Sequence, residues 1–263
     1  GPPPKRLLRK FKGPFPEVLL HLLKPPHPGG DGGGQTRDKG IQKGCRHVLI
    51  MPCVYWRGMP FDQEAEQLDR SIAFYLAEKG LIPSCRPGCF ACCYPWVTLS
   101  RLEAEAIYPH LNEAQRERIQ NEGPRRLALL RAHKDDPGFP AWFFQKAFAE
   151  NTPCPLLEDG LCGVYAQRPL ACRGVLTDQD PRLCRPDAPY PSPGHYLRPP
   201  LFMARLRMEA LWEEERTRYG FLLLGEIAGL LFLLEDLPET KAEVIRLLED
   251  LGVLGGRWGY QVV

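Results

Sequence analysis

Apolar residues recur at helical spacing along much of the chain, and helices are the elements that this pattern predicts. Leu68, Ile72 and Leu76 share one face of a helix predicted over 62–79, and Gly80 supplies its end. No run of alternating apolar and polar residues is long enough to predict a strand of any length. The pattern therefore indicates a mainly α-helical protein.

Two capping boxes predict where further helices begin. Ser100 with Glu103, and Asn112 with Gln115, have the spacing at which two side chains satisfy the free amides of a first helical turn. The helix that starts at Ser100 is expected to end near Tyr108. The sequence therefore predicts a pair of consecutive helices after residue 100.

Prolines and aromatic residues divide the rest of the chain. Pro124 predicts the start of a separate helix, because proline suits a first turn and breaks a helix interior. An aromatic helix is expected after Pro140, and its stripe is predicted to be core rather than a cofactor site: Trp142, Phe143, Phe144 and Phe148. The pattern predicts three closing helices, over 201–218, 221–235 and 239–251.

The composition is that of a soluble globular protein with a real core: 263 residues, 44% of them hydrophobic and 25% charged. A net charge of +2 is too small to indicate a nucleic-acid partner or a polybasic membrane surface protein. The most apolar stretch, 221–234, is shorter than the ~20 residues of a membrane span and contains Glu226. We therefore expect no membrane span.

The first fifty residues differ from the rest. They hold ten Lys and Arg against three acidic residues, with eight prolines and nine glycines. Such a composition buries too little apolar surface to fold, so we expect a disordered basic arm over 1–50. A single helical domain is expected over 60–255, with cysteine motifs at 85–184 and C-terminal helices at 200–251. The patch 18–23 lacks a cleavage site, so the cytoplasm, where thiols stay reduced, is the expected compartment.

Eight of the ten cysteines fall in two groups. The first is a C-x3-C-x2-C-C motif made of Cys85, Cys89, Cys92 and Cys93. Pro87 and Gly88 fit the centre of a type II turn between the first two. In a helical turn Cys89, Cys92 and Cys93 share one face, whereas in an extended chain Cys92 and Cys93 point to opposite sides and serve separate sites. The sequence leaves both arrangements open.

The second group lies among prolines and glycines and consists of Cys154, Cys162, Cys172 and Cys184. Tight turns leave amides free to donate to sulfur, which helps to offset the repulsion between gathered thiolates. Arginines near the cysteines are candidates for offsetting the negative charge of the thiolates, and the alternative for each is a surface salt bridge. They are Arg86, Arg168, Arg173, Arg182 and Arg185. Arg168 and Arg173 are the expected cofactor-binding residues, and Arg173 is the best placed by sequence to face a thiolate.

Reduced cysteines at this spacing indicate a metal site, with buried unliganded thiols or redox disulfides as the alternatives. Four thiolates fit one zinc ion or one iron–sulfur cluster equally well. Cys45 and Cys53 lie in or near the arm and are left out of the site. Nothing pairs His110, His133 or His195 with a cysteine, and 213–215 has the pattern of a solvated helix face.

The motifs resemble those of a known family. The cysteine set, with Cys154-Pro155-Leu156-Leu157, Asp159-Gly160-Leu161-Cys162-Gly163-Val164-Tyr165 and Arg168-Pro169-Leu170-Ala171-Cys172-Arg173, is similar to that of the YkgJ-type cysteine-cluster proteins. The similarity covers about 80–185, and Cys184 matches least. These proteins are catalogued as zinc- or iron-chelating and are often called iron–sulfur-cluster proteins.

The resemblance implies that the eight cysteines are metal ligands. A related cluster occurs in flagellin lysine methylases, which use S-adenosylmethionine, so redox or methyl-transfer chemistry stays open, with no catalytic residue assigned. Full radical chemistry is disfavoured, because Ala91 stands where radical enzymes usually carry an aromatic residue and no β/α barrel is indicated. The expectation is a protein that holds an iron–sulfur cluster or zinc. The alternative is a non-catalytic, zinc-stabilised interaction module with a protein partner.

Overall fold

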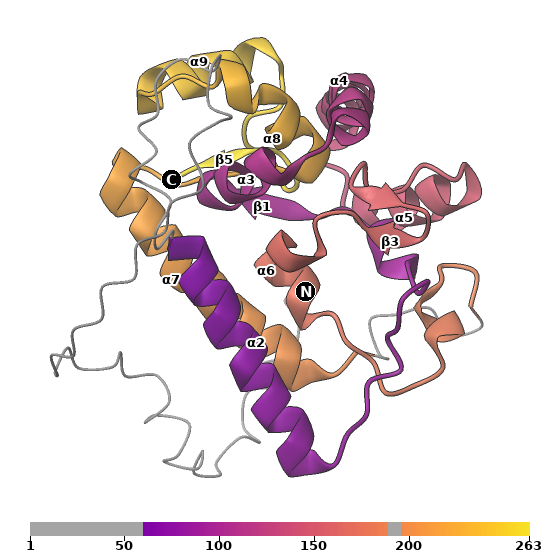
Figure 1. The fold of residues 1–263 in the computed structure, drawn as a ribbon. Coiled ribbons are helices and arrows are strands. Elements are labelled where there is room, and N and C mark those ends of the chain that lie inside the picture. Colours follow the sequence, from indigo (N-terminus) through magenta and orange to yellow (C-terminus); the bar gives the residue numbers. More distant parts are fainter. Residues whose placement is uncertain (1–59, 189–195) are drawn as a thin grey trace, which may run out of the picture. The chain divides into compact units, whose positions relative to one another are not determined.

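The computed structural model describes residues 60–188 and 196–263, all of which lie within one compact unit, Met51–Val263. The arm expected over 1–50, together with Cys45, Cys53 and His195, lies outside the described residues. Within the described ranges the protein is mainly helical and its strands are short (Figure 1). The predicted fold class, a mainly α protein with an irregular cysteine-rich part, is confirmed.

The helices, turns and strands of the described residues have the following bounds. The α-helices are α2 (Pro60–Lys79), α3 (Arg101–Ile107), α4 (Glu113–His133), α5 (Phe139–Ala149), α6 (Leu170–Gly174), α7 (Arg198–Tyr219), α8 (Ile227–Leu233) and α9 (Lys241–Asp250). The 3₁₀ turns are η1 (Ala91–Cys93), η2 (Tyr108–His110), η3 (Tyr165–Gln167), η4 (Pro181–Cys184) and η5 (Leu234–Asp236). The strands are β1 (Thr98–Ser100), β2 (Leu157–Glu158), β3 (Leu161–Cys162), β4 (Leu223–Glu226) and β5 (Gln261–Val262).

Local sequence signals set several of these helix ends. Both predicted capping boxes are present, Ser100 with Glu103 at α3 and Asn112 with Gln115 at α4. Gly80, at φ +61°, follows the end of α2 as expected. The helices predicted near 62–79, 201–218 and 239–251 are therefore confirmed to within a few residues.

An antiparallel sheet with the order β1-β4-β5 joins distant parts of the chain. Leu99 lies opposite Gly225, and Leu223 lies opposite Val262. The prediction of one helix over 221–235 was wrong in its first part, because these residues pair with strands on both sides. Glu226 then accepts a hydrogen bond from the Gly229 amide at 2.9 Å and so caps α8.

Helix α4 continues through Pro124, so the prediction of a new helix at that residue was also wrong. Proline costs the interior of a helix one hydrogen bond, and packing can offset that cost. Here α4 packs extensively against α8, and a β-carbon at Gly123 would overlap Phe232 of that helix. The close approach of the two helices accounts for a continuous helix at this point.

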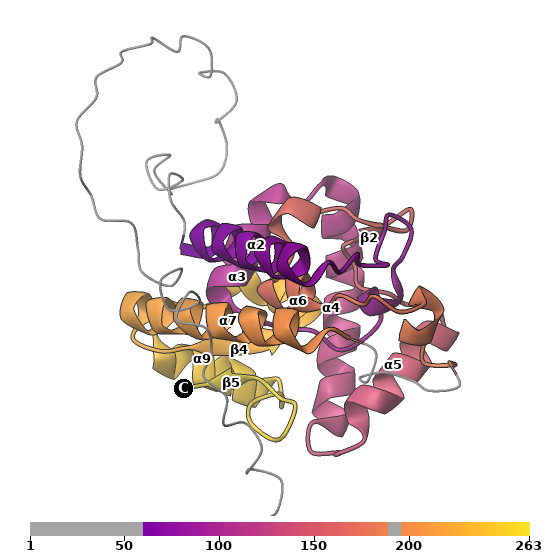
Figure 2. The same cartoon turned by 90° about the horizontal axis from the view of Figure 1, so that it is seen from below.

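Two groups of buried apolar residues form the core. The larger includes Leu130 of α4, Phe143 of α5 and Leu230 of α8, and the smaller includes Leu68 of α2 and Leu211 of α7. The short helix α3 contributes to both. Helices α2 and α7 lie side by side, with α6 packed against each of them (Figures 1 and 2). The C-terminal leucines therefore belong to the core, and α6 is fixed to it.

Substitution of Gly225 by alanine is expected to destabilise the protein by about 1–3 kcal/mol. An added β-carbon would overlap the ring of Tyr260, which is fully buried and has no room to move away. Urea unfolding followed by circular dichroism measures the change. Gly138→Ala is the matched control, because its β-carbon would meet only Asp136, at 3.4 Å, and its φ is −86°. Equal stability of the two variants would contradict the close approach.

Candidate metal centre

The predicted turn between the first two cysteines is present. The Cys89 amide donates to the Arg86 carbonyl at 2.9 Å, and Gly88 has φ +85°, the value that the third residue of a type II turn requires. The turn folds the chain back between Cys85 and Cys89. Proline and glycine at its centre therefore position the two thiols, as the sequence indicates.

Cys92 and Cys93 lie in a helical turn rather than in an extended chain. They belong to η1, in which the Cys93 amide donates to the Phe90 carbonyl at 2.9 Å. Their side chains are hydrogen-bonded to each other, which lowers the pKa of Cys92 to about 7 and raises that of Cys93. The extended alternative, with the two thiols on opposite sides, is therefore excluded.

A tight hairpin brings two cysteines of the second group together. Asp159 and Gly160, at φ +48° and +76°, form the two-residue turn between β2 and β3. Leu157 pairs with Cys162 across the hairpin, and the Leu157 amide donates to the Cys154 carbonyl at 3.0 Å. Cys154 and Cys162, eight positions apart in sequence, thus lie in one small unit.

Main-chain hydrogen bonds join the two groups of cysteines. The Cys154 amide donates to the Cys93 carbonyl at 2.6 Å, and the Ser84 amide donates to the Thr177 carbonyl at 2.7 Å. The turn η4, which ends at Cys184, packs against η1. These contacts draw cysteines from separate segments of the chain into one region, as the sequence predicts.

Backbone amides donate to several of the sulfur atoms. Ala91 donates to Cys89, Leu156 donates to Cys154 and Val164 donates to Cys162, in each case from two residues further along the chain. Such donors stabilise negative charge on sulfur. The amides expected from the turn-rich sequence are therefore present at these three thiols.

Burial opposes ionisation at most of these thiols. Desolvation is the largest cause that raises the pKa of Cys154 to about 12 and that of Cys184 to about 11, and it raises the pKa of Cys172 well above its usual value. Neighbouring cysteines raise these pKa values further, because one thiolate repels the next. A cation bound among the sulfur atoms would remove both costs.

The sulfur atoms lie near one another without forming a ready-made coordination site. The eight cysteines in the described ranges are all free thiols. In residues 60–188 and 196–263, no three His, Cys, Asp or Glu side chains are arranged so that they could hold a metal ion as they stand. The donor chemistry fits zinc or iron, and the amides already face several sulfurs. Binding would require the cysteine side chains to rotate toward a common centre.

The two candidate arginines have different surroundings. Arg173 is almost fully buried and donates to Asp69, to the Ala166 carbonyl and to the Arg168 carbonyl. Its guanidinium therefore positions the backbone near Cys172 and makes its hydrogen bonds to oxygen. Arg168 stacks on Tyr165 at 3.8 Å and lowers the pKa of both Cys92 and Cys162.

The other arginines near the cysteines either form surface ion pairs or offset the charge of a thiolate. Arg182 pairs with Asp180, and Arg185 pairs with Asp187, so both make the surface ion pairs that were the alternative. Arg86 lowers the pKa of Cys89 by its charge. Arg173 likewise lowers the pKa of Cys162, so three of the arginines predicted for this region offset negative charge on thiols: Arg86, Arg168 and Arg173.

Two buried carboxylates that support the region were not recognised from the sequence. Glu103 accepts from the Ser100 amide at 2.9 Å and from the Leu170 amide, at the start of α6, at 3.0 Å. Glu215 accepts from Leu102 at 2.9 Å and from Leu223 at 2.7 Å. The prediction that 213–215 is a solvated face was wrong for Glu215, which is fully buried. The capping-box spacing was the only sequence signal for Glu103.

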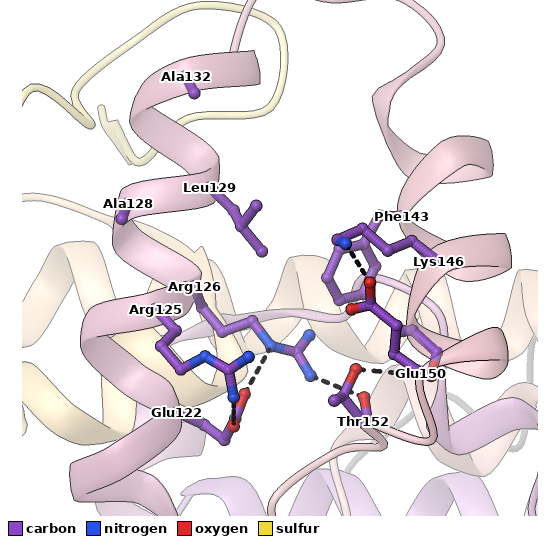
Figure 3. Close-up of a pocket in the computed structure, with 11 residues that line it drawn as sticks. Glu122, Arg125, Arg126, Ala128, Leu129, Ala132, Phe143, Lys146, Glu150 and Thr152 are labelled. Carbon is purple, nitrogen blue, oxygen red and sulfur yellow. Dashed lines mark hydrogen bonds and ion pairs between the residues drawn. The ribbon is translucent and has the colours of Figure 1, made fainter.

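A pocket of about 710 Å³ lies between α4 and α5 (Figure 3). No cysteine lines it. Arg126 forms part of its wall, packs on the Phe143 ring and donates to the carbonyls of Thr152 and Pro153, both at 3.2 Å. Because Pro153 precedes Cys154, the arginine helps to fix the chain that enters the second cysteine group.

A helical scaffold that carries eight free cysteines on short turns is typical of thiolate metal-binding proteins and differs from disulfide-rich folds. Residues 84–185 match the family CxxCxxCC, described as "Putative zinc- or iron-chelating domain". This match confirms the resemblance of the segment to YkgJ-type proteins. No curated protein and no solved structure matches the chain.

The other expectations are tested only in part. None of the described helices combines the length and apolar character of a membrane span. No finding on the described residues supports redox or methyl-transfer chemistry. The expected protein partner and the assignment of each cysteine as a ligand stay predictions.

Proposed function

We propose that the thiolates of the eight cysteines bind zinc or iron and that the metal holds the cysteine-bearing stretches 84–100 and 154–187 in their folded form. The observation that carries this proposal is the gathering of free thiols from separate segments. Each of them has at least one other cysteine within electrostatic reach. Free thiolates so close together repel one another, and a bound cation turns that repulsion into attraction.

The local structure supports a stabilising role for the metal. The cysteine-bearing stretches 84–100 and 154–187 contain only strands of two or three residues, single turns and the short helix α6, in contrast to the long helices α4 and α7. Such short elements cannot order themselves without strong tertiary support. A structural zinc site supplies roughly 10–16 kcal/mol, which matches or exceeds the 5–15 kcal/mol net stability typical of a domain.

The residues near the thiols have distinct roles in this proposal. The ligands are Cys85, Cys89, Cys92, Cys93, Cys154, Cys162, Cys172 and Cys184. Arg86 and Arg168 offset part of the negative charge, since each lowers the pKa of a nearby thiol. Arg173 ties Asp69 of α2 to the loop before α6, and so positions Cys172. The metal, when bound, supplies a crosslink between these segments.

Zinc ions and an iron–sulfur cluster differ in what they need besides thiolates. Zinc satisfies four thiolates without further components, whereas a cluster also needs inorganic sulfide. The sequence favours iron–sulfur narrowly, mostly through the family resemblance. A structural role is the function that the short, turn-rich elements favour, whichever metal is bound.

Anaerobic purification of the full chain, followed by metal analysis and a visible spectrum, tests the proposal. We expect stoichiometric zinc or iron. A brown protein containing sulfide would identify a cluster, and a colourless protein containing zinc would identify zinc. The Cys45→Ser, Cys53→Ser double variant is the control and should keep its metal. A folded, fully reduced chain that neither contains metal nor takes up added zinc or iron would refute the proposal.

A further inference from the structure

Four of the cysteines are mutual neighbours, and we call them the outer set: Cys85, Cys89, Cys92 and Cys184. The Pro87–Gly88 turn brings the first two together, and the contact between η4 and η1 brings Cys184 to Cys92. Every member of the set lies within electrostatic reach of the three others. The set therefore has the close mutual proximity that a common ligand requires.

The remaining four form a second group, which we call the inner set: Cys93, Cys154, Cys162 and Cys172. The 2.6 Å hydrogen bond from the Cys154 amide to the Cys93 carbonyl joins two of them, and the β2–β3 hairpin adds Cys162. Cys172 of α6 lies within electrostatic reach of Cys154 and Cys162, and Cys93 lies within reach of Cys154 and Cys172. The inner set is thus assembled by contacts other than those of the outer set.

The two sets meet at adjacent residues. Cys92 belongs to the outer set and Cys93 to the inner set, and their side chains are hydrogen-bonded. Cys92 also lies within electrostatic reach of Cys162 and Cys172. The sets are therefore close neighbours, and each takes one cysteine from η1.

The number of ligands favours a division into two sites. A structural zinc ion takes four thiolates, and an iron–sulfur cluster is commonly held by four, so eight cysteines supply twice the number that either needs. One four-ligand site would leave four thiols beside it without a metal.

From this arrangement we infer that the chain has two adjacent four-thiolate metal sites, one in the outer set and one in the inner set, which meet at the hydrogen-bonded thiols of Cys92 and Cys93. This inference rests on the proposed function and specifies its stoichiometry. It assigns a second metal ion, or a second cluster, to a single domain.

Titration of the reduced, metal-free full chain with cobalt(II) under anaerobic conditions tests the inference. Absorption from thiolate–cobalt bonds should saturate at about two equivalents per chain. The outer variant Cys89→Ser, Cys184→Ser and the inner variant Cys162→Ser, Cys172→Ser should each saturate at about one. The Cys45→Ser, Cys53→Ser control loses the same number of thiols and should keep the full stoichiometry.

The outcomes separate this inference from the proposed function. Saturation at one equivalent in the unsubstituted chain would overturn the two sites and leave metal binding intact. Absence of thiolate–cobalt absorption would overturn both. Should the inner variant fail to fold, the unsubstituted chain and the outer variant still decide the number of sites. Loss of all cobalt binding from a folded outer variant would also overturn the inference.

Discussion

Removal of the metal with a chelator is expected to unfold the cysteine segment while the C-terminal helices stay folded. The segment depends on short turns, whereas α8 and α9 contribute Leu230, Leu231 and Val244 to the larger core. The loss should be on the order of 10 kcal/mol, the amount that a structural thiolate site contributes. Hydrogen exchange measures it: amides in 84–100 and 154–187 should lose protection, and those in 227–250 should retain it.

The same chelator already saturated with zinc is the control for this experiment, because it cannot extract the metal. Readdition of metal should restore protection in the cysteine segment. Unchanged exchange in 84–100 and 154–187 after complete metal removal would show that packing alone holds the segment. The proposed structural role of the metal would then be wrong.

Replacement of Glu103 by alanine is expected to destabilise the protein by about 2–6 kcal/mol. The carboxylate is fully buried and accepts from the amides of Ser100 and Leu170, so its removal leaves two buried donors without an acceptor. Each such donor costs about 1–3 kcal/mol. Because Leu170 begins α6, the variant should also weaken metal retention through Cys172. Urea unfolding and metal analysis measure the two effects.

Two further variants serve as controls for Glu103→Ala. Glu103→Gln keeps one acceptor oxygen and should lose less stability than the alanine variant. Glu209→Ala removes a carboxylate from an exposed pair with Arg205 on α7 and should change stability by no more than about 0.5 kcal/mol. If Glu103→Ala were as stable as Glu209→Ala, the carboxylate would not be the support that its hydrogen bonds indicate.

Elements specified by neighbouring residues were predictable from the sequence. The boxes at Ser100 and Asn112 start α3 and α4, and the Pro87–Gly88 turn lies where the local chemistry requires it. Elements that depend on distant partners were missed. β4 becomes a strand because it pairs with β1 and β5, both distant from it in sequence, and α4 passes Pro124 because α8 packs there.

The candidate site was likewise predictable only in part. Its cysteines could be predicted, since eight of them fall in two groups whose spacing is typical of metal ligands. Their grouping could not, because it depends on contacts such as that of Cys154 with Cys93 and of η4 with η1. The burial of Glu215 was missed for a related reason, since its partners Leu102 and Leu223 are far away in sequence or belong to the unrecognised strand.

The hydrogen bond between the Cys154 amide and the Cys93 carbonyl involves only main-chain atoms. Serine at either position retains both atoms and nearly the same side-chain size, so that substitution removes a sulfur without removing the link between the segments. Serine scanning at these positions can therefore measure what each thiol contributes to affinity while the path of the chain is kept.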